Sequence, residues 1–289
     1  MLKTRIITAI FLIIGFLILL FSASHMVWAL STLAITLIAV WEWSNLIKLN
    51  HRQMLLNVWV ALSIGLAFIF TASTQLVVVS DALMFYLLFG ILAIASVFWL
   101  FLAPIWLISR RVISHKLIMA ILGLFLLLAT WIALVGLHRI GPWMLLAVLA
   151  TVWLADSAAY FAGKRFGRHK LAVEISPGKT WEGVAGAFVG VTIYGAMLCY
   201  FLQINPWQII GLWLIVMLSI VGDLFESLLK RQAGVKDSSQ LLPGHGGVLD
   251  RIDKLAIHRT ANLSILQGLK SNLQNHFFSS TFYFGINRL

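Results

Sequence analysis

The chain of 289 residues is strongly apolar and basic, with 61% hydrophobic residues, only 11% charged residues and a net charge of +11. Soluble domains carry about 25% charged residues, so this composition and a mean hydropathy of +0.97 exclude an ordinary soluble globule, a disordered chain and a collagen. They indicate a polytopic membrane protein. The single cysteine, Cys199, excludes an intrachain disulfide.

Eight apolar runs predict membrane-spanning helices in chain order. Each run is long enough for a helix to cross a hydrocarbon core, which takes about 17–25 residues. The fourth run is long enough to be tilted or partly interfacial. The predicted fold class is therefore an all-α, polytopic transmembrane helix bundle of about eight spans, at 5–24, 27–44, 55–73, 82–108, 117–137, 142–163, 184–204 and 207–229.

The positions of the basic residues predict the orientation of these spans. With a cytoplasmic N-terminus, 20 of the 21 Lys and Arg residues fall on the inner side, and only Arg139 falls outside. Cytoplasmic loops of membrane proteins carry such an excess of Lys and Arg. We therefore expect the N-terminus and the C-terminal tail to be cytoplasmic, and the basic charge requires no nucleic-acid partner.

Acidic residues are concentrated in the second half of the chain. Residues 1–150 hold only Glu42 and Asp81, and the other eight acids lie beyond them. We therefore expect any chemistry in the second half. The predicted organisation is five N-terminal spans (1–140), a catalytic transmembrane region (141–253) with cytoplasmic loops at 164–183 and 230–253, and an atypical tail (254–289).

Three carboxylates stand inside the predicted spans, near their cytoplasmic ends. They are Asp156, Asp223 and Glu226, and the last two are three residues apart on one helix face. A charge in the bilayer centre costs about 3 kcal/mol on insertion scales. These residues either pair with Lys or Arg from a neighbouring helix or reach the interface, or they line a polar cavity, open to the cytosol, that binds a divalent cation.

The segment 227–253 is the densest polar stretch of the chain. Its glycine-rich turn at 243–247 lets backbone N–H groups approach an anion. Asp250 and Asp253, together with Asp223, form a plausible oxygen site for Mg²⁺. A solvated loop is the alternative. The histidines, including His245, show no zinc spacing.

The loop 164–183 contains a Gly-Lys-Thr triplet that ends at Thr180. It is not a P-loop, because Val173 replaces the earlier glycine and we expect no strand before it. We expect a short basic turn that opens a helix at 180–183, which can bind phosphate through its amides and Lys179. Anchoring by positive charge alone is the alternative.

The segment that begins at Ser227 resembles the signature of the phosphatidate cytidylyltransferases, also called CDP-diacylglycerol synthases. The stretches 156–160 and 176–183 are similar to the family's as well, in the same order. Every fixed position of the signature is met, at Ser227, Lys230, Arg231, Lys236, Asp237, Pro243, Gly244, His245, Gly246, Gly247, Asp250, Arg251 and Asp253.

This resemblance implies a nucleotidyltransferase that transfers CMP from CTP to phosphatidic acid, giving CDP-diacylglycerol and pyrophosphate. It implies Mg²⁺ as cofactor and a bacterial inner (cytoplasmic) membrane location, with the active site facing the cytoplasm. The expected partners are CTP, phosphatidic acid and membrane lipids, and a homodimer is left open. A CTP-dependent lipid kinase, a catalytically impaired variant and an ion transporter remain alternatives.

Carried onto matching positions, the resemblance implies a role for each candidate residue. The catalytic residues are Asp223, Asp250, Lys230, Lys236 and Asp253; the substrate-binding residues are Ser176, Lys179, Arg231, His245, Gly246, Gly247, Arg251 and Ser227; the metal ligands are Asp223, Asp250, Glu226 and Asp156.

The tail departs from the family's pattern, which continues with one more transmembrane helix after Asp253. No apolar run in 254–289 reaches ~18 residues. We therefore expect the final helix to be missing or replaced.

Overall fold

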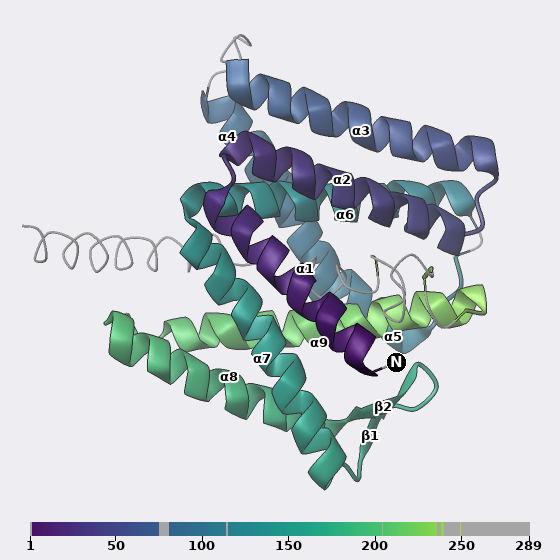
Figure 1. The fold of residues 1–289 in the computed structure, drawn as a ribbon. Coiled ribbons are helices and arrows are strands. Elements are labelled where there is room, and N and C mark those ends of the chain that lie inside the picture. The colour runs from purple at the N-terminus through teal and green to yellow at the C-terminus, as the bar shows by residue number, and fades with distance from the viewer. Residues whose placement is uncertain are drawn as a thin grey trace, which may run out of the picture. The chain divides into compact units, whose positions relative to one another are not determined.

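The computed structural model describes residues 2–74, 81–113, 115–203, 205–235, 238–239 and 249 (Figure 1). Over these residues the chain is helical apart from one small β-hairpin, so the predicted all-α class is confirmed. The described chain falls into two compact units, one formed by 1–142 with the residues from 221 onward and the other by 143–220. The division at 140 and 253 stays a prediction.

The first unit contains the N-terminal helices and the C-terminal half of α9. Its fourth predicted span is a helix interrupted by a π-helical segment, η1. Pro104 lies two residues beyond this segment and lacks the N–H that a regular helix uses, which explains the local widening. The elements are α1 (Leu2–Ser22), α2 (His25–Leu46), α3 (His51–Thr74), α4 (Asp81–Val97), η1 (Phe98–Leu102), α5 (Ala103–Ser109), α6 (Lys116–Ile140) and α9 (Gln208–Ala233).

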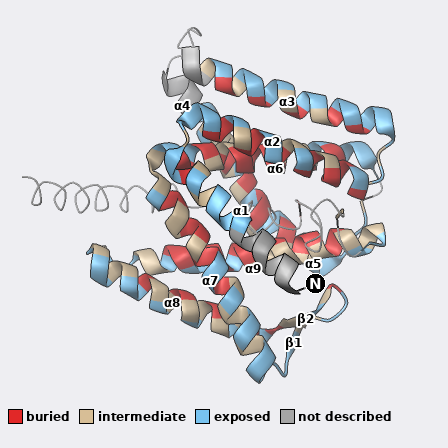
Figure 2. Cartoon of the chain, viewed as in Figure 1, coloured by how far each residue is buried: buried red, intermediate tan, exposed pale blue. Residues whose placement is uncertain are grey.

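Helices α2 and α6 form the core of this unit, and Figure 2 shows buried residues along both. Two buried tryptophans join them. The indole N–H of Trp43 donates to the Met119 carbonyl at 2.9 Å, and that of Trp131 to the Ala29 carbonyl at 3.1 Å. Gly123 makes room for the first indole, since a Cβ there would collide with Trp43. The antiparallel pair is thus fixed along its length by buried, satisfied indoles.

The second unit pairs helix α7 (Pro142–Phe166) with helix α8 (Trp181–Leu202). Small residues line their contact. A Cβ added to Gly186 would collide with the Ala162 methyl, and one added to Gly190 would lie 2.7 Å from the Ala158 methyl. Close backbone approach through small residues is the usual way for membrane helices to pack. The antiparallel hairpin β1 (Lys170–Ala172) and β2 (Ser176–Thr180) connects the two helices.

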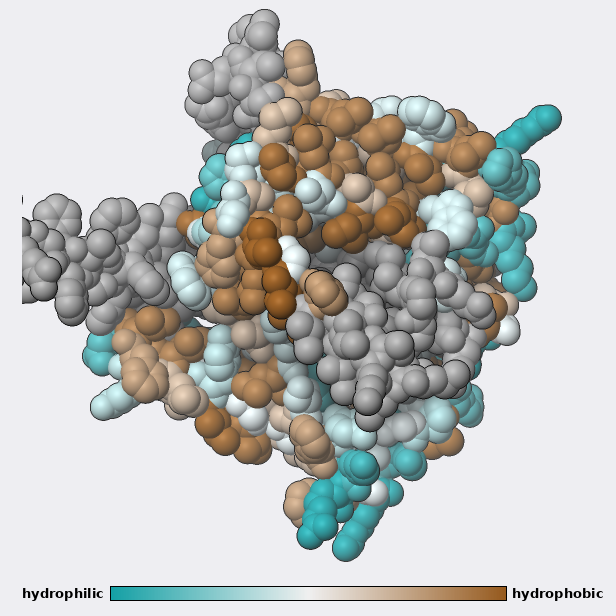
Figure 3. Space-filling model, in the orientation of Figure 1, coloured by the Kyte–Doolittle hydropathy of each residue, from teal (hydrophilic) through white to brown (hydrophobic). Residues whose placement is uncertain are grey.

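Seven described helices are long and apolar enough to cross a membrane. The first predicted span, 5–24, remains a prediction, because the described apolar stretch of α1, Ile13–Ser22, is shorter than a membrane-spanning helix. Apolar side chains gather over α2 and α3 on the face shown in Figure 3. Among the residues of α3, Leu56 is 64% and Trp59 is 62% exposed. Such exposure suits contact with lipid and would be unusual for a soluble domain.

Candidate active site

The C-terminal half of α9 carries the first group of predicted site residues. Asp223 is half-buried and Glu226 is buried, with 5% of its surface exposed. Between them, Phe225 packs edge-on against the rings of three residues, Phe98, Trp99 and Trp106, at centroid distances of 5.3–5.6 Å. This aromatic cluster fixes the rotation of α9 about its axis, and so fixes which way its carboxylates face.

One of these carboxylates forms an ion pair along its own helix. The Lys230 ammonium lies 3.1 Å from Glu226 Oε1, and the two side chains are 15% and 6% exposed. The sequence analysis offered a partner on a neighbouring helix as the alternative to metal binding, whereas the partner of Glu226 here is a lysine of the same helix. The structure therefore brings Glu226 and Lys230 together, with Asp223 one turn earlier on the same helix.

Helix α9 ends in a Schellman motif just before the signature segment continues. Gly234 has φ +77°, its N–H donates to the Arg231 carbonyl, and the N–H of Val235 donates to the Lys230 carbonyl at 2.9 Å. Glycine suits this left-handed position because it has no Cβ. The sequence Ala-Gly after Gln232 therefore stops the helix and turns the chain.

Residues on both sides of 240–248 converge on one carboxylate of α2. Glu42 has none of its surface exposed. Its Oε1 accepts a hydrogen bond from the Ser239 hydroxyl at 2.5 Å, and its Oε2 accepts from the Ser238 hydroxyl at 3.3 Å and the Leu249 N–H at 2.5 Å. No function was predicted for Glu42 from sequence, because no local pattern signals a contact with residues about 200 positions away.

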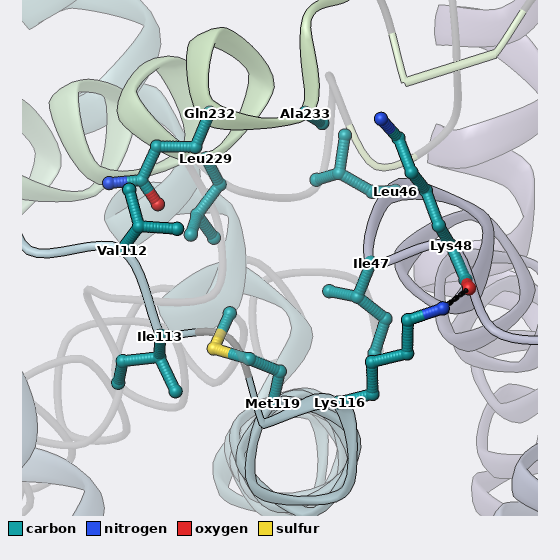
Figure 4. Close-up of a pocket in the computed structure, with 10 residues that line it drawn as sticks. All are labelled: Leu46, Ile47, Lys48, Val112, Ile113, Lys116, Met119, Leu229, Gln232 and Ala233. Atoms are coloured by element: carbon teal, nitrogen blue, oxygen red, sulfur yellow. Dashed lines mark hydrogen bonds between the residues drawn. The ribbon is translucent and has the colours of Figure 1, made fainter.

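A pocket of about 170 Å³ opens between the end of α2, the start of α6 and the end of α9 (Figure 4). Its walls are mostly apolar, with Leu46, Met119 and Leu229 among them. Lys116 donates to the Lys48 carbonyl at 2.5 Å across one side. None of the lining residues was predicted as a site residue, although Leu229 and Gln232 flank Lys230 and Arg231 on α9.

The second unit carries the other group of predicted residues. Asp156 is half-buried on α7, and Ser176 and Lys179 are half-buried on β2. Because successive strand residues point to opposite faces, positions 176 and 179 fall on opposite faces of β2. Thr180 caps α8 by accepting from the Gly183 N–H at 3.1 Å, so the predicted helix start at 180–183 is confirmed.

The expectation that no strand precedes the Gly-Lys-Thr triplet was wrong. Strand β1 precedes it, and the triplet itself lies in β2. The hairpin is tied to α8 by Glu182, which accepts from the His169 N–H at 3.1 Å and contacts His169 Nδ1 at 2.7 Å. A P-loop is still excluded, because its glycine-rich turn would have to lie between strand and helix and here the triplet is paired strand.

Comparison with known proteins identifies the family. The sequence model of the cytidylyltransferase family matches residues 3–267. The chain belongs to this family. The phosphatidate cytidylyltransferase of Haemophilus influenzae is 36% identical over 275 residues, which cover 88% of this chain and 95% of the relative.

Two further phosphatidate cytidylyltransferases share shorter regions with this member of the cytidylyltransferase family. The Pseudomonas aeruginosa protein is 47% identical over 140 residues, 46% of this chain and 52% of the relative. A Staphylococcus aureus protein is 48% identical over 122 residues, 41% of this chain and 45% of the relative. The resemblance seen in the signature segment is confirmed by the family model over residues 3–267 and by the Haemophilus influenzae relative over 88% of this chain.

The carboxylate side chains of the candidate site are of the chemical type that binds Mg²⁺. Asp223 offers the hard oxygen ligands that Mg²⁺ prefers. Among the residues that the structure describes, no group of three or more Asp, Glu, His or Cys side chains is close enough to hold a metal. The remaining predicted ligands and binding residues lie outside the described residues; they are Lys236, His245, Gly246, Gly247, Asp250, Arg251 and Asp253.

Proposed function

We propose that this protein transfers CMP from CTP to phosphatidic acid, giving CDP-diacylglycerol and pyrophosphate. The observation that carries the proposal is the similarity to the Haemophilus influenzae phosphatidate cytidylyltransferase over 88% of this chain. The complete signature from Ser227 to Asp253 supports it, as does the fixed carboxylate face of α9. The alternative of an ion transporter has no comparable support from the family match.

The reaction depends more on charged groups held in position around the phosphates than on a strong general base. A phosphatidate oxygen is already anionic near neutral pH, so it can attack the α-phosphorus of CTP in line while pyrophosphate leaves. Asp223 and Asp250 would hold Mg²⁺, which when bound neutralises charge on the phosphates. Lys230, Lys236 and Lys179 would bind the triphosphate or the lipid phosphate and stabilise the charge that develops on it.

Further residues complete the proposed assignment. Glu226 and Asp156 are secondary candidates for the metal, and the ion pair of Glu226 with Lys230 favours a role for Glu226 in orienting that lysine. The remaining residues would contact substrate or shape the loop around it; they are Ser176, Ser227, Arg231, His245, Gly246, Gly247, Arg251 and Asp253.

The proposed location is the bacterial inner membrane, with the active site on the cytoplasmic side. The distribution of 20 of the 21 basic residues supports this orientation. In the second unit, exposed hydrophilic residues gather at the C-terminal end of α7 and around the hairpin (Figure 3), including Lys164, Arg165 and Arg168. CTP is a cytosolic nucleotide, so a site on the cytoplasmic side of the membrane can bind both CTP and the lipid substrate. A homodimer stays a prediction.

The proposal is tested with purified protein, phosphatidic acid, Mg²⁺ and CTP labelled at either the α or the γ phosphorus. We expect label from α-³²P-CTP in the chloroform-soluble fraction and none from γ-³²P-CTP. Asp250→Asn should abolish the transfer while the protein remains membrane-inserted. Lipid labelling from the γ position instead would make the protein a CTP-dependent lipid kinase, and no labelling from folded wild-type protein would contradict both activities.

A further inference from the structure

A buried carboxylate outside the predicted catalytic half of the chain contacts the signature segment. Glu42 lies on α2, which the tryptophan contacts fix against α6, and its neighbour Trp43 makes one of those contacts. The carboxylate has no exposed surface. Burying a charged group is costly unless its oxygens are hydrogen-bonded, so the partners of this carboxylate decide whether it can be buried.

The donors around this carboxylate hydrogen-bond both of its oxygens. Among the residues that the structure describes, they are the hydroxyls of Ser238 and Ser239, which lie a few residues beyond the end of α9, and the backbone N–H of Leu249. Leu249 is itself buried, with 3% of its surface exposed. One carboxylate thus holds both ends of the stretch 240–248, which contains the glycine-rich turn.

The contact at Leu249 matters because the next residue in the chain is Asp250, the proposed metal ligand. Consecutive Cα atoms are only about 3.8 Å apart, so an anchored Leu249 amide restricts the backbone position from which the Asp250 side chain can reach a metal. Groups that orient metal ligands in this way are worth roughly 10–100-fold in metal affinity or activity.

We propose that Glu42 is a positioning residue of the active site, which gathers Ser238, Ser239 and the Leu249 amide and thereby fixes the backbone that carries Asp250. The proposal rests on the proposed function for its link to catalysis. Glu42 itself need touch neither substrate nor metal. Its effect is exerted through the signature segment.

The test compares Glu42→Ala and Glu42→Gln with wild type and with a matched control. Glutamine retains one carbonyl acceptor for the Leu249 N–H, and its amide can donate to a serine hydroxyl, so it preserves most of the contacts. The control is Ser44→Ala on the same helix. Ser44 is also fully buried, but its hydroxyl bonds to the Val40 carbonyl and to the Asn57 amide, outside the signature segment.

Two readouts separate positioning from general stability. The first is hydrogen exchange of the peptide that contains Leu249, measured without metal or substrate; we expect roughly tenfold faster exchange in Glu42→Ala and little change in Ser44→Ala. The second is the Mg²⁺ dependence of kcat. Glu42→Ala should lose roughly 10–100-fold in kcat or in apparent Mg²⁺ affinity, Glu42→Gln should recover most of the loss, and Ser44→Ala should lose stability alone.

The outcomes distinguish the two proposals. If wild type is active and Glu42→Ala matches Ser44→Ala in exchange and in Mg²⁺ dependence, the positioning role is overturned and the function stands. If wild type makes no CDP-diacylglycerol, the function fails, and the exchange readout still decides whether Glu42 holds the segment. Failure of Glu42→Gln to improve on Glu42→Ala would also contradict the proposal.

Discussion

At the scale of single residues, two carboxylates one turn apart on α9 have different surroundings. Glu226 is paired with Lys230 at 3.1 Å, whereas Asp223 lies one turn nearer the start of the helix and is half-buried. The pairing gives Glu226 a structural reason to be charged, and the family resemblance makes Asp223 the first candidate for the metal. This difference can be measured.

We expect Asp223→Asn to lower activity more than stability, and Glu226→Gln to lower stability more than activity. Asp223→Asn should lower kcat by at least the roughly 100-fold that loss of a metal-orienting group can cost, with little effect on unfolding. Glu226→Gln removes one charge of a nearly buried pair and should lower the free energy of unfolding by about 1–3 kcal/mol, less than for a fully buried pair.

The two variants are compared with wild type by thermal unfolding in detergent and by steady-state kinetics on the same preparations. The division of roles would be wrong if Glu226→Gln lost catalysis as severely as Asp223→Asn while keeping the wild-type unfolding temperature. That result would make both carboxylates metal ligands.

At the scale of elements, the helices were predictable and the connections were not. The sixth span, expected at 142–163, is α7 at Pro142–Phe166, because bilayer thickness sets the length of an apolar run. The hairpin was missed because Lys170–Ala172 and Ser176–Thr180 are short and carry no alternation of apolar and polar residues. The π-helical interruption at Phe98–Leu102 was missed too, since hydropathy does not report backbone geometry.

Helices α2 and α9 both end in a Schellman motif, but with different residues at its left-handed position. In α9 this residue is Gly234, and after α2 it is Lys48, with φ 55°. The hydrogen bonds after α2 match, from the Lys48 N–H to the Asn45 carbonyl and from the Leu49 N–H to the Ser44 carbonyl. A side chain in the left-handed region costs roughly 1–2 kcal/mol, so α2 keeps a lysine at a strained position beside the pocket of Figure 4.

Substitutions at these two positions should therefore change the free energy of unfolding in opposite directions. Gly234→Ala should lower the free energy of unfolding by about 1 kcal/mol. Lys48→Gly should raise it by about 0.5–1 kcal/mol, the strain relief being partly offset by the greater freedom of glycine in the unfolded chain. Denaturant or thermal unfolding in one detergent measures both. A loss of stability in Lys48→Gly would show that the lysine side chain contributes more than its backbone strain costs.

At the scale of the whole molecule, the site residues predicted from sequence divide between two units. Ser227, Lys230 and Arg231 lie with Glu42 in the first, and Asp156, Ser176 and Lys179 lie in the second. The signature identified the chemistry because its residue types and spacing are local in sequence. The contacts of Glu42 could not be read in this way, since they join positions 196 to 207 residues apart and depend on the packing of α2.

Ligand binding to the folded protein gives a test at this scale. CTP with Mg²⁺ should raise the unfolding temperature in detergent by several degrees, because a ligand at 100 times its Kd stabilises the native state by about 2.7 kcal/mol. CTP with EDTA and ATP with Mg²⁺ are the matched controls, and Asp223→Asn should abolish the response. An equal shift with ATP would contradict selectivity for CTP, and no shift with CTP would contradict a CTP site.

The contact between α7 and α8 has a mechanical consequence. With Gly186 against Ala162 and Gly190 against Ala158, the two backbones are in close contact at two successive turns of α8, and an axial shift of one residue, about 1.5 Å, would move both methyl groups away from the glycines that accommodate them. We therefore expect the two helices to move together. Asp156 on α7 and the hairpin that ends at Thr180 would travel together, and substrate could change the distance between them only by bending the strands.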